Sequence, residues 1–388
     1  MPSPSTHSIL ELSAAEAERA ADLHRSSVVI DTAAPSCAPG AFTEAMVAAL
    51  VAAVAAGGSA GELIGALERI VDEALMKGEH PDFWSLWDQA GVDVASITVG
   101  VFGRRPFTHE NAVADLARWV RRFDRLPELI RVTRASDIVR SQTAGTHGVL
   151  LHLANAALIG EDIDQLVVLR DLGVGSMQLT YNARNLIGDG CAARRDGGLS
   201  TFGVDVLHAM NDLGILVDLA HSGDQTTLDA IELAHSPCAI THSSCRTLVD
   251  IPRAVGDDVL RAIGQSGGYF GVLVTPFTIT IDEAPTLDVW LRHVHHAAEI
   301  AGIENIGIGT DWGVTFPQVL VDRLNAEMLR PGFRPSHAVD WGASLPGFSS
   351  WADWPNLTQA LVADGFNDEE IRGLIGGNFQ RVFSQVSP

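Results

Sequence analysis

The sequence contains two short apolar runs that each end in a histidine, Ile215-Leu-Val-Asp-Leu-Ala-His221 and Cys238-Ala-Ile-Thr-His242. A third run of the same kind, Ile306-Gly-Ile-Gly-Thr-Asp311, ends in an aspartate. Each run has the length of a buried strand and lies between longer helical patterns. Parallel strands that deliver polar side chains at their C-terminal ends are typical of the active-site face of an α/β barrel.

Five further segments have the pattern of strands: 27–31, 94–99, 148–153, 176–181 and 268–274. Helical patterns separate them, for example at 202–213, 226–234, 257–265 and 287–301. Eight strands that alternate with helices predict the α/β class and a (β/α)8 TIM barrel. We expect one barrel domain over 1–388, with 36–90 as a helical insertion after the first strand. No GxGxxG motif follows an early strand, so a dinucleotide site has no support.

Composition narrows the class of partner. The formal net charge of −22 argues against nucleic acid and anionic membranes. The four cysteines form no CxxC pair, so we expect a reducing compartment rather than a disulfide scaffold. The N-terminal segment lacks the basic and apolar regions of a signal peptide, and the apolar stretch 41–56 is too short to span a bilayer. We therefore expect a cytoplasmic protein without a nucleic-acid or membrane partner.

The strand-end side chains are the candidate site. His221 and His242 would lie close enough to share one metal ion, since neutral imidazole is a common zinc ligand; the alternative is a pair of hydrogen-bonded histidines. Asp311 could ligate metal or move a proton, or it could cap a following helix. Arg253 could hold a substrate carboxylate, or form an ordinary surface ion pair. Asn182 opens a polar, glycine-rich loop over 182–191; we expect Asn182 to bind substrate, and the alternative is a plain connection.

The chain resembles the renal (membrane) dipeptidase family, peptidase family M19, in the amidohydrolase superfamily, from about Gly145 to Val382. The resemblance is carried by Gln178-Leu-Thr-Tyr-Asn182, Asn211 to His221, Thr241-His-Ser-Ser-Cys245, Ile251-Pro-Arg253, Gly302 to Asp311 and Gly376-Gly-Asn-Phe-Gln-Arg-Val382. The string Asn185-Leu-Ile-Gly-Asp-Gly-Cys191 is similar to a divergent bacterial branch.

The resemblance implies a hydrolase of dipeptides with a metal centre. Carried over residue by residue, His221 and His242 match histidines that hold one metal. Arg253 matches the arginine that binds the substrate carboxylate, and Asp311 matches the general acid/base. A small carboxylate-bearing substrate and a homodimer are also implied.

Other positions depart from the family pattern. The His-x-Asp pair that holds the other metal is replaced by Ala33 and Pro35, and the bridging glutamate by Ala154. Tyr181 stands in place of a catalytic histidine and can still donate a hydrogen bond to an oxyanion. Alanine and proline offer no ligand atom, so we expect one divalent metal, zinc, rather than two. His152 could add a ligand, or it could be a buried core histidine.

Three functions follow from these residues. The first is a one-metal hydrolase acting on a small amide or dipeptide-like substrate. The second is a lyase, dehydratase or isomerase of a small amino or hydroxy acid on the same barrel, because a fold does not fix a reaction. The third is a catalytically inactive, ligand-binding relative, which the lost metal ligands suggest and the retained Arg253 and Asp311 oppose.

Overall fold

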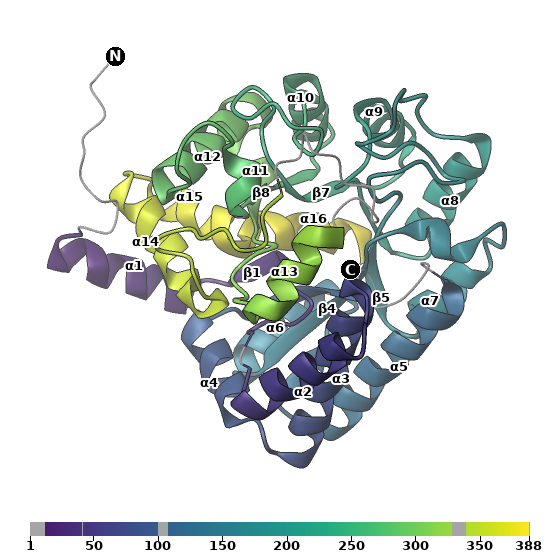
Figure 1. Ribbon diagram of the computed structural model, residues 1–388. Coiled ribbons are helices and arrows are strands. Elements are labelled where there is room, and N and C mark those ends of the chain that lie inside the picture. The colour runs from purple at the N-terminus through teal and green to yellow at the C-terminus, as the bar shows by residue number, and fades with distance from the viewer. Residues whose placement is uncertain (1–11, 41, 100–107, 328–338, 388) are drawn as a thin grey trace.

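The structure, a computed structural model, describes residues 12–40, 42–99, 108–327 and 339–387. Its core is a parallel sheet whose strands follow the chain order (Figure 1). The strands are β1 (Ile30–Ala34), β2 (Val94–Val99), β4 (His147–Leu153), β5 (Val174–Gln178), β6 (Leu216–Asp218), β7 (Ala239–Ser243), β8 (Tyr269–Leu273) and β9 (Ile306–Gly309). A short strand, β3 (Leu129–Arg131), pairs with β4 outside this path.

The first and last strands come together and nearly close the sheet into a barrel. Asp31 on β1 accepts hydrogen bonds from the backbone N–H and the hydroxyl of Thr310, at 3.0 and 2.6 Å. The backbone N–H of Asp311 donates to the carbonyl of Ala33 at 2.7 Å. The predicted eight-stranded α/β barrel is therefore confirmed.

Helices alternate with the strands along the chain. They are α1 (Ala14–Ser26), α2 (Glu44–Ala55), α3 (Ala60–Lys77), α4 (Pro81–Ala90), α5 (His109–Arg125), α6 (Ala135–Ala144), α7 (Gln165–Asp171), α8 (Thr201–Asp212), α9 (Asp224–Leu233), α10 (Asp257–Gln265), α11 (Pro276–Ile279), α12 (Leu287–Ala301), α13 (Gln318–Glu327), α14 (Trp354–Ala363), α15 (Asp368–Arg372) and α16 (Asn378–Val386). Helix α8 stops where the sequence predicts, because Gly214 adopts the left-handed conformation (φ 65°) that ends helices.

Several predicted strand boundaries were wrong. The first strand was expected over 27–31 and lies at Ile30–Ala34, because Asp31 does not end the strand but lies within it, bonded to Thr310 and to the indole N–H groups of Trp351 and Trp354. Strand β5 ends at Gln178, before Tyr181, and β6 ends at Asp218, before His221. The three-residue β3 was missed, since a strand of that length carries no readable alternation.

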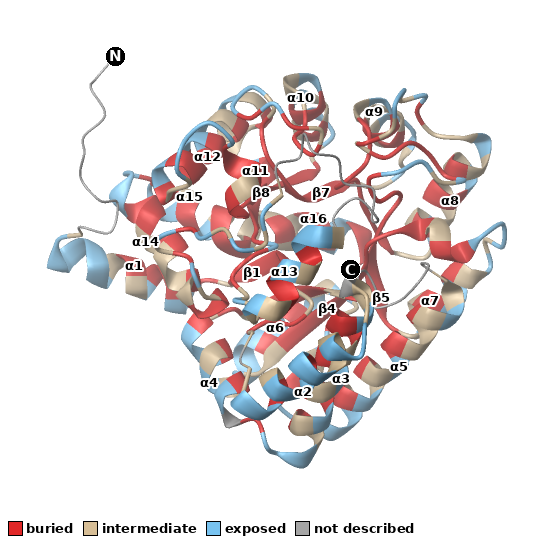
Figure 2. Ribbon diagram, viewed as in Figure 1, coloured by how far each residue is buried: buried red, intermediate tan, exposed pale blue. Residues whose placement is uncertain are grey.

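One end of the barrel is closed by the last helix. Phe379, Phe383 and Val386 of α16 pack against side chains that point down the barrel, among them Leu216 and Tyr269. All of these residues are buried, and Figure 2 shows the strands as an almost continuous buried layer. Because this end is filled with apolar side chains, the site must open at the opposite, C-terminal end of the strands.

The segment between β1 and β2 contains α2, α3 and α4. Helix α3 begins with a capping box between Ser59 and Glu62, and Gly78 ends it in the left-handed conformation. Leu50 of α2 and Leu67 of α3 form an apolar cluster with Leu320 of α13. These helices therefore pack against a segment that follows β9, beside the mouth of the barrel.

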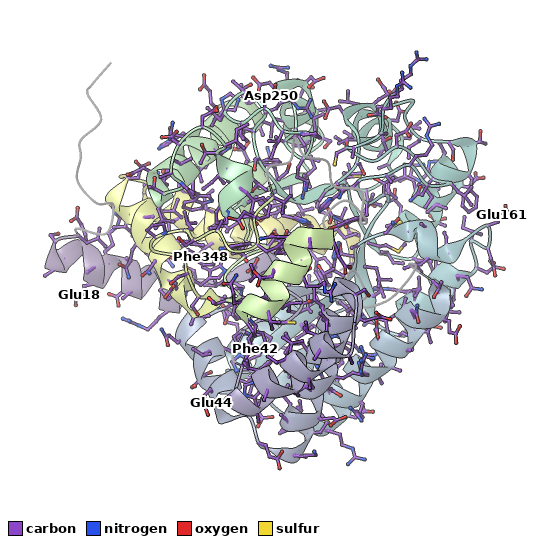
Figure 3. The ribbon with its side chains drawn as sticks, viewed as in Figure 1. Glu18, Phe42, Glu44, Glu161, Asp250 and Phe348 are labelled. Atoms are coloured by element: carbon purple, nitrogen blue, oxygen red, sulfur yellow. The ribbon has the colours of Figure 1, made fainter. Side chains whose placement is uncertain are left out.

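The surface is acidic, as Figure 3 illustrates with the exposed side chains of Glu18, Glu44, Glu161 and Asp250. In the described part of the chain, no helix has the length and apolar character needed to cross a bilayer.

Candidate active site

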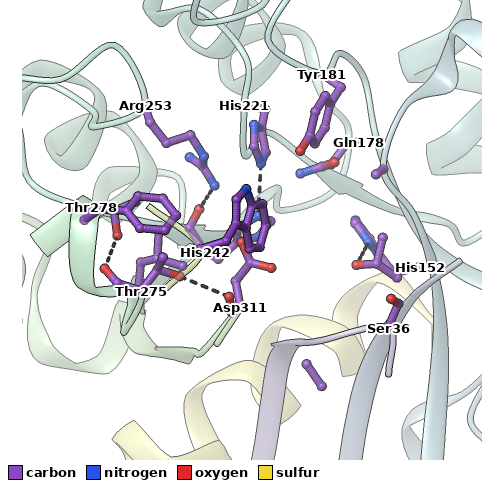
Figure 4. Close-up of a pocket in the computed structure, with 16 residues that line it drawn as sticks. Ser36, His152, Gln178, Tyr181, His221, His242, Arg253, Thr275, Thr278 and Asp311 are labelled. Atoms are coloured by element: carbon purple, nitrogen blue, oxygen red, sulfur yellow. Dashed lines mark hydrogen bonds between the residues drawn. The ribbon is translucent and has the colours of Figure 1, made fainter. Parts of the chain in front are cut away.

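A pocket with about 730 Å³ of empty space, partly open to solvent, lies at the C-terminal end of the strands (Figure 4). Its walls come from successive strands and the loops after them. The polar lining residues are Ser36, Thr98, His152, Gln178, Tyr181, His221, His242, Arg253, Thr275, Thr278 and Asp311. Five predicted site residues, taken from five different loops and strands, thus line one pocket. The sixth, Asn182, is not among the described lining residues.

The two histidines meet through their outer ring nitrogens. The Nε2 atoms of His221 and His242 are 3.3 Å apart, and both side chains are buried. The Nδ1 of His221 lies 2.8 Å from the Asn182 carboxamide oxygen, which accepts its proton. Asn182 therefore supports His221 from behind, and its predicted contact with substrate stays a prediction.

His242 is oriented by a buried carboxylate. The Thr241 hydroxyl donates to Asp218 Oδ2 at 2.7 Å, so its oxygen can accept the Nδ1–H of His242 at 2.8 Å. With both Nδ1 atoms protonated, the two Nε2 atoms face each other with lone pairs. Burial, followed by the charge of Arg253, holds the pKa of His242 well below its usual range, so this ring stays neutral. A proton shared between the two nitrogens, as in the hydrogen-bonded pair considered above, or a cation bound to both would relieve this contact.

Asp218 also holds His152. Four donors converge on the carboxylate: the Nε2–H of His152 at 3.0 Å, the Thr241 hydroxyl, and the backbone N–H groups of Ala220 and Thr241 at 3.0 Å each. The Nδ1 of His152 lies 3.2 Å from the Thr98 hydroxyl. Burial opposes the charge of Asp218, but these donors prevail and lower its pKa to about 2. Both ring nitrogens of His152 are thus engaged, and a metal could bind Nδ1 only by displacing the Thr98 hydroxyl.

Arg253 is anchored at the pocket wall by barrel groups. Its guanidinium donates to the backbone carbonyl of His242 and to the Ser243 hydroxyl, the latter at 3.3 Å. The side chain is 5% exposed and forms no ion pair with the carboxylates of the described residues. The surface ion pair considered above is therefore not the role of Arg253, and its charge faces the pocket.

Asp311 opens to the pocket space just beyond β9. The Asp311 side chain is exposed to the partly open pocket, and partial burial of its carboxyl among the pocket walls raises its pKa to about 7, against the positive charge of Arg253. No helix begins at Asp311, since the next one, α13, starts at Gln318. The helix-cap alternative for Asp311 is therefore wrong.

Tyr181 stacks its ring on His221, with centroids 4.2 Å apart. Burial raises the pKa of Tyr181 above its usual range, so the phenol keeps its proton. Its hydroxyl can thus act as a hydrogen-bond donor at the pocket.

The number of metal ions that the pocket can hold depends on the side-chain atoms available as ligands. Two Nε2 atoms at 3.3 Å match the edge of a tetrahedral zinc site, for which Zn–N bonds of 2.0–2.1 Å give about 3.3–3.4 Å. On the opposite wall, Ala34 and Ala154 line the pocket and supply no ligand atom. The described residues contain no group of three or more His, Cys, Asp or Glu side chains placed to hold a metal. Within the described residues, the pocket therefore offers two histidine nitrogens on one wall and no carboxylate or imidazole ligand at Ala34 and Ala154.

Sequence reasoning missed Gln178 and Asp218. Both are polar residues inside apolar strands, at positions that face the barrel interior, and both are fully buried. A polar side chain in such a strand is the signal that could have identified them, because buried polar groups need partners.

The fold and this pocket define a barrel of the amidohydrolase type with a histidine pair at its mouth. The model of the membrane dipeptidase family, peptidase family M19, matches residues 88–333. The chain belongs to this family, as its motifs predict.

Three relatives illustrate the match. Dipeptidase verJ from Clonostachys rogersoniana is 30% identical over 242 residues, covering 60% of this chain and 55% of the relative. An amidohydrolase structure from Pseudomonas aeruginosa has a TM-score of 0.74 and 25% identity, over 95% of this chain and 98% of that one. A metallo peptidase structure from Rhodobacter sphaeroides, liganded with a phosphinate mimic of L-Ala-D-Ala, has a TM-score of 0.65 and 18% identity over 93% and 99% of the two chains. The chain spans about half the length of the curated relatives that it matches.

Proposed function

We propose that this protein is a metal-dependent hydrolase that cleaves a small amide or dipeptide-like substrate with a free carboxylate, using one divalent metal, zinc, per chain. The observation that carries the proposal is the pair of Nε2 atoms, 3.3 Å apart, whose Nδ1 atoms are both held by acceptors. Such outer contacts fix the ring tautomer that binds metal. His221 and His242 would hold the ion, and it would supply an activated water and a Lewis acid.

Arg253 binds the substrate carboxylate in this proposal. A guanidinium pairs with a carboxylate through two parallel hydrogen bonds, and its effect is large where water is excluded. Because Arg253 is already anchored to β7, little further ordering is needed when substrate binds. The leaving amino acid thus lies on the Arg253 side of the histidine pair.

Asp311 moves the proton between the water and the leaving amine. A group with a pKa near the working pH serves best as both acid and base, and the pKa of Asp311 is about 7. Tyr181 donates a hydrogen bond to the oxyanion, since its phenol stays protonated.

The test combines metal analysis with turnover. We expect about one zinc, manganese or iron per chain by plasma mass spectrometry, lost in His221→Ala and in His242→Ala. We also expect hydrolysis of some members of a broad dipeptide and acyl-amino-acid panel, abolished by Asp311→Asn. Turnover in ¹⁸O water must place the label in the released acid; product without label would point to a lyase or isomerase instead. Metal-loaded protein without turnover on the panel would contradict the proposal.

A cytoplasmic location remains part of the proposal. All four cysteines are free in the structure, which supports a reducing compartment. A homodimer is likewise proposed from the family, and sedimentation analysis would test it.

A further inference from the structure

The pocket has a second polar wall, across the histidine pair from Arg253 (Figure 4). It is formed by Ser36, Thr98, His152, Ala154 and Gln178, which we call the amide wall. In strand order, its members from β2, β4 and β5 lie together, whereas Arg253 follows β7. If Arg253 holds the carboxylate of the leaving amino acid, the acyl half of the substrate lies against the amide wall. The inference therefore rests on the proposed function.

Gln178 is the only member of the amide wall with a wholly unused side chain among the described residues. Its side chain is fully buried, and neither its amide oxygen nor its amide nitrogen has a hydrogen-bond partner in the described part of the chain. Figure 4 shows the amide directed into the pocket, below Tyr181. A buried amide without a partner is costly. The folded protein thus keeps one donor and one acceptor ready for a bound group.

The amide wall carries no free negative charge. Asp311 is the one carboxylate among the described lining residues, and Asp218 behind His152 is already occupied by four donors. Two other carboxylates, Glu68 and Asp115, line a separate cavity behind Ser36, where Arg118 lies 3.9 Å from Glu68 and 2.6 Å from Asp115. The stretches 100–107 and 328–338, outside the described residues, contain no Asp or Glu.

Cations, by contrast, surround the scissile position. Arg253 contributes one positive charge, and the proposed metal contributes two more. The protonated amine of an ordinary dipeptide would lie against the amide wall, where the described residues supply no counter-ion, and this is unfavourable in a poorly hydrated site. A neutral group that both donates and accepts hydrogen bonds meets no such penalty.

We propose that Gln178 forms a subsite for an uncharged hydrogen-bonding group on the acyl half of the substrate, so that the enzyme prefers hydroxyacyl- or amidoacyl-amino acids to dipeptides with a free ammonium. The carboxamide of Gln178 donates to and accepts from this group. The alanines of the wall, Ala34 and Ala154, leave the space that the group occupies.

Three substrates that differ in one substituent test the subsite. Glycolyl-leucine carries a hydroxyl, acetyl-leucine a hydrogen, and glycyl-leucine an ammonium at the same carbon. We expect kcat/KM to fall in that order, by about tenfold at each step, because a site built to pair with a hydroxyl rejects an analogue that lacks it. A wild-type enzyme that cleaves glycyl-leucine best would overturn the inference.

Two variants assign the preference to Gln178. In Gln178→Leu, kcat/KM for glycolyl-leucine should be no higher than kcat/KM for acetyl-leucine. Gln178→Glu supplies a counter-ion for the ammonium. It should therefore raise kcat/KM for glycyl-leucine at least tenfold relative to kcat/KM for glycolyl-leucine. The matched control is Gln142→Leu, an exposed glutamine on α6 that should leave all three ratios unchanged. Unchanged ratios in both Gln178 variants, with circular dichroism melts that show folded protein, would refute the assignment.

Equilibrium binding separates this inference from the proposed function. Calorimetry with zinc-loaded Asp311→Asn measures binding of the three compounds without turnover. Affinity that falls from glycolyl-leucine to acetyl-leucine to glycyl-leucine would support the subsite, even if the wild-type enzyme hydrolyses none of the three compounds. No binding of any compound at millimolar concentration, or tightest binding of glycyl-leucine, would overturn it.

Discussion

Asp218→Asn removes the charge that orders the two sides of the pocket while it keeps the shape of the side chain. In the wild-type protein, Oδ2 accepts from His152 and from the Thr241 hydroxyl, and Oδ1 accepts from two backbone N–H groups. An asparagine must place its NH₂ group against one of these pairs of donors. With the NH₂ group toward the two backbone N–H groups, both of their hydrogen bonds are lost; toward the other pair, the Thr241 hydroxyl must turn and the His152 Nε2–H loses its acceptor.

The free energy of unfolding should fall by about 3–5 kcal/mol. Hydrogen bonds to a charged group contribute ~1.5–3 kcal/mol each; one or two are lost and the others lose their charged acceptor, and removing one partner of a buried charged network costs about 3–5 kcal/mol. At roughly 2 °C per kcal/mol for a chain of this size, the melting temperature should drop by about 6–10 °C. Because the folded pKa of Asp218 is lowered to about 2, its contribution is present above its ordinary pKa and is lost as the pH falls toward 2. The difference between wild type and variant should therefore shrink in acid.

The variant should also bind metal more weakly. Without Asp218 as acceptor, the Thr241 hydroxyl can turn and donate to His242 Nδ1, which moves the ring proton to the nitrogen that faces the metal. Loss of such an outer contact typically costs 10–100-fold in metal affinity.

Urea unfolding of the metal-free proteins and zinc titration by calorimetry measure the two effects separately. Asp205→Asn, an exposed position on α8, is the control and should change neither. A loss of stability below about 1 kcal/mol together with unchanged zinc affinity would refute the role assigned to Asp218.

Three other predictions follow from single side chains. Asp311→Asn should lower kcat by about 10²–10⁴-fold with little change in KM, because it removes proton transfer and not binding; a changed KM alone would count against the assignment. Arg253→Lys should raise KM for a carboxylate substrate and leave KM for its C-terminal amide nearly unchanged, since lysine lacks the planar fork. His293 donates through Nε2 to the carbonyl of Ile279 at 2.8 Å, and its Nδ1 accepts from the N–H of Cys245. Burial lowers the pKa of His293 to about 4. Its neutral form therefore contributes stability that is present above pH 6.5 and is lost, by about 3 kcal/mol, as the pH falls toward 4. Urea unfolding measured against pH should show this loss in the wild-type protein and not in His293→Gln.

The barrel could be predicted because its strands are apolar runs bounded by helical patterns. The convergence of His221, His242 and Arg253 at one end then follows from parallel strand direction alone. What the sequence could not provide was the pairing of polar groups inside the barrel. Nothing in the spacing shows that Asp218 serves both His152 and His242, or that the Gln178 amide lacks a partner. Such pairings depend on which strands are neighbours and on their register.

The strained backbone at the mouth of the barrel explains why three of the site residues are where they are. Among the described residues, the non-glycine positions with positive φ are Asn182, His221 and Asp311, at 54°, 63° and 44°. Each such conformation costs on the order of 1–3 kcal/mol and persists only where the surrounding structure enforces it. All three residues lie two to four residues beyond the ends of their strands, which are Gln178, Asp218 and Gly309. At His221 and Asp311 the left-handed residue lines the pocket, and at Asn182 it supports His221 from behind, so the rigid barrel offsets the strain and the site gains its geometry.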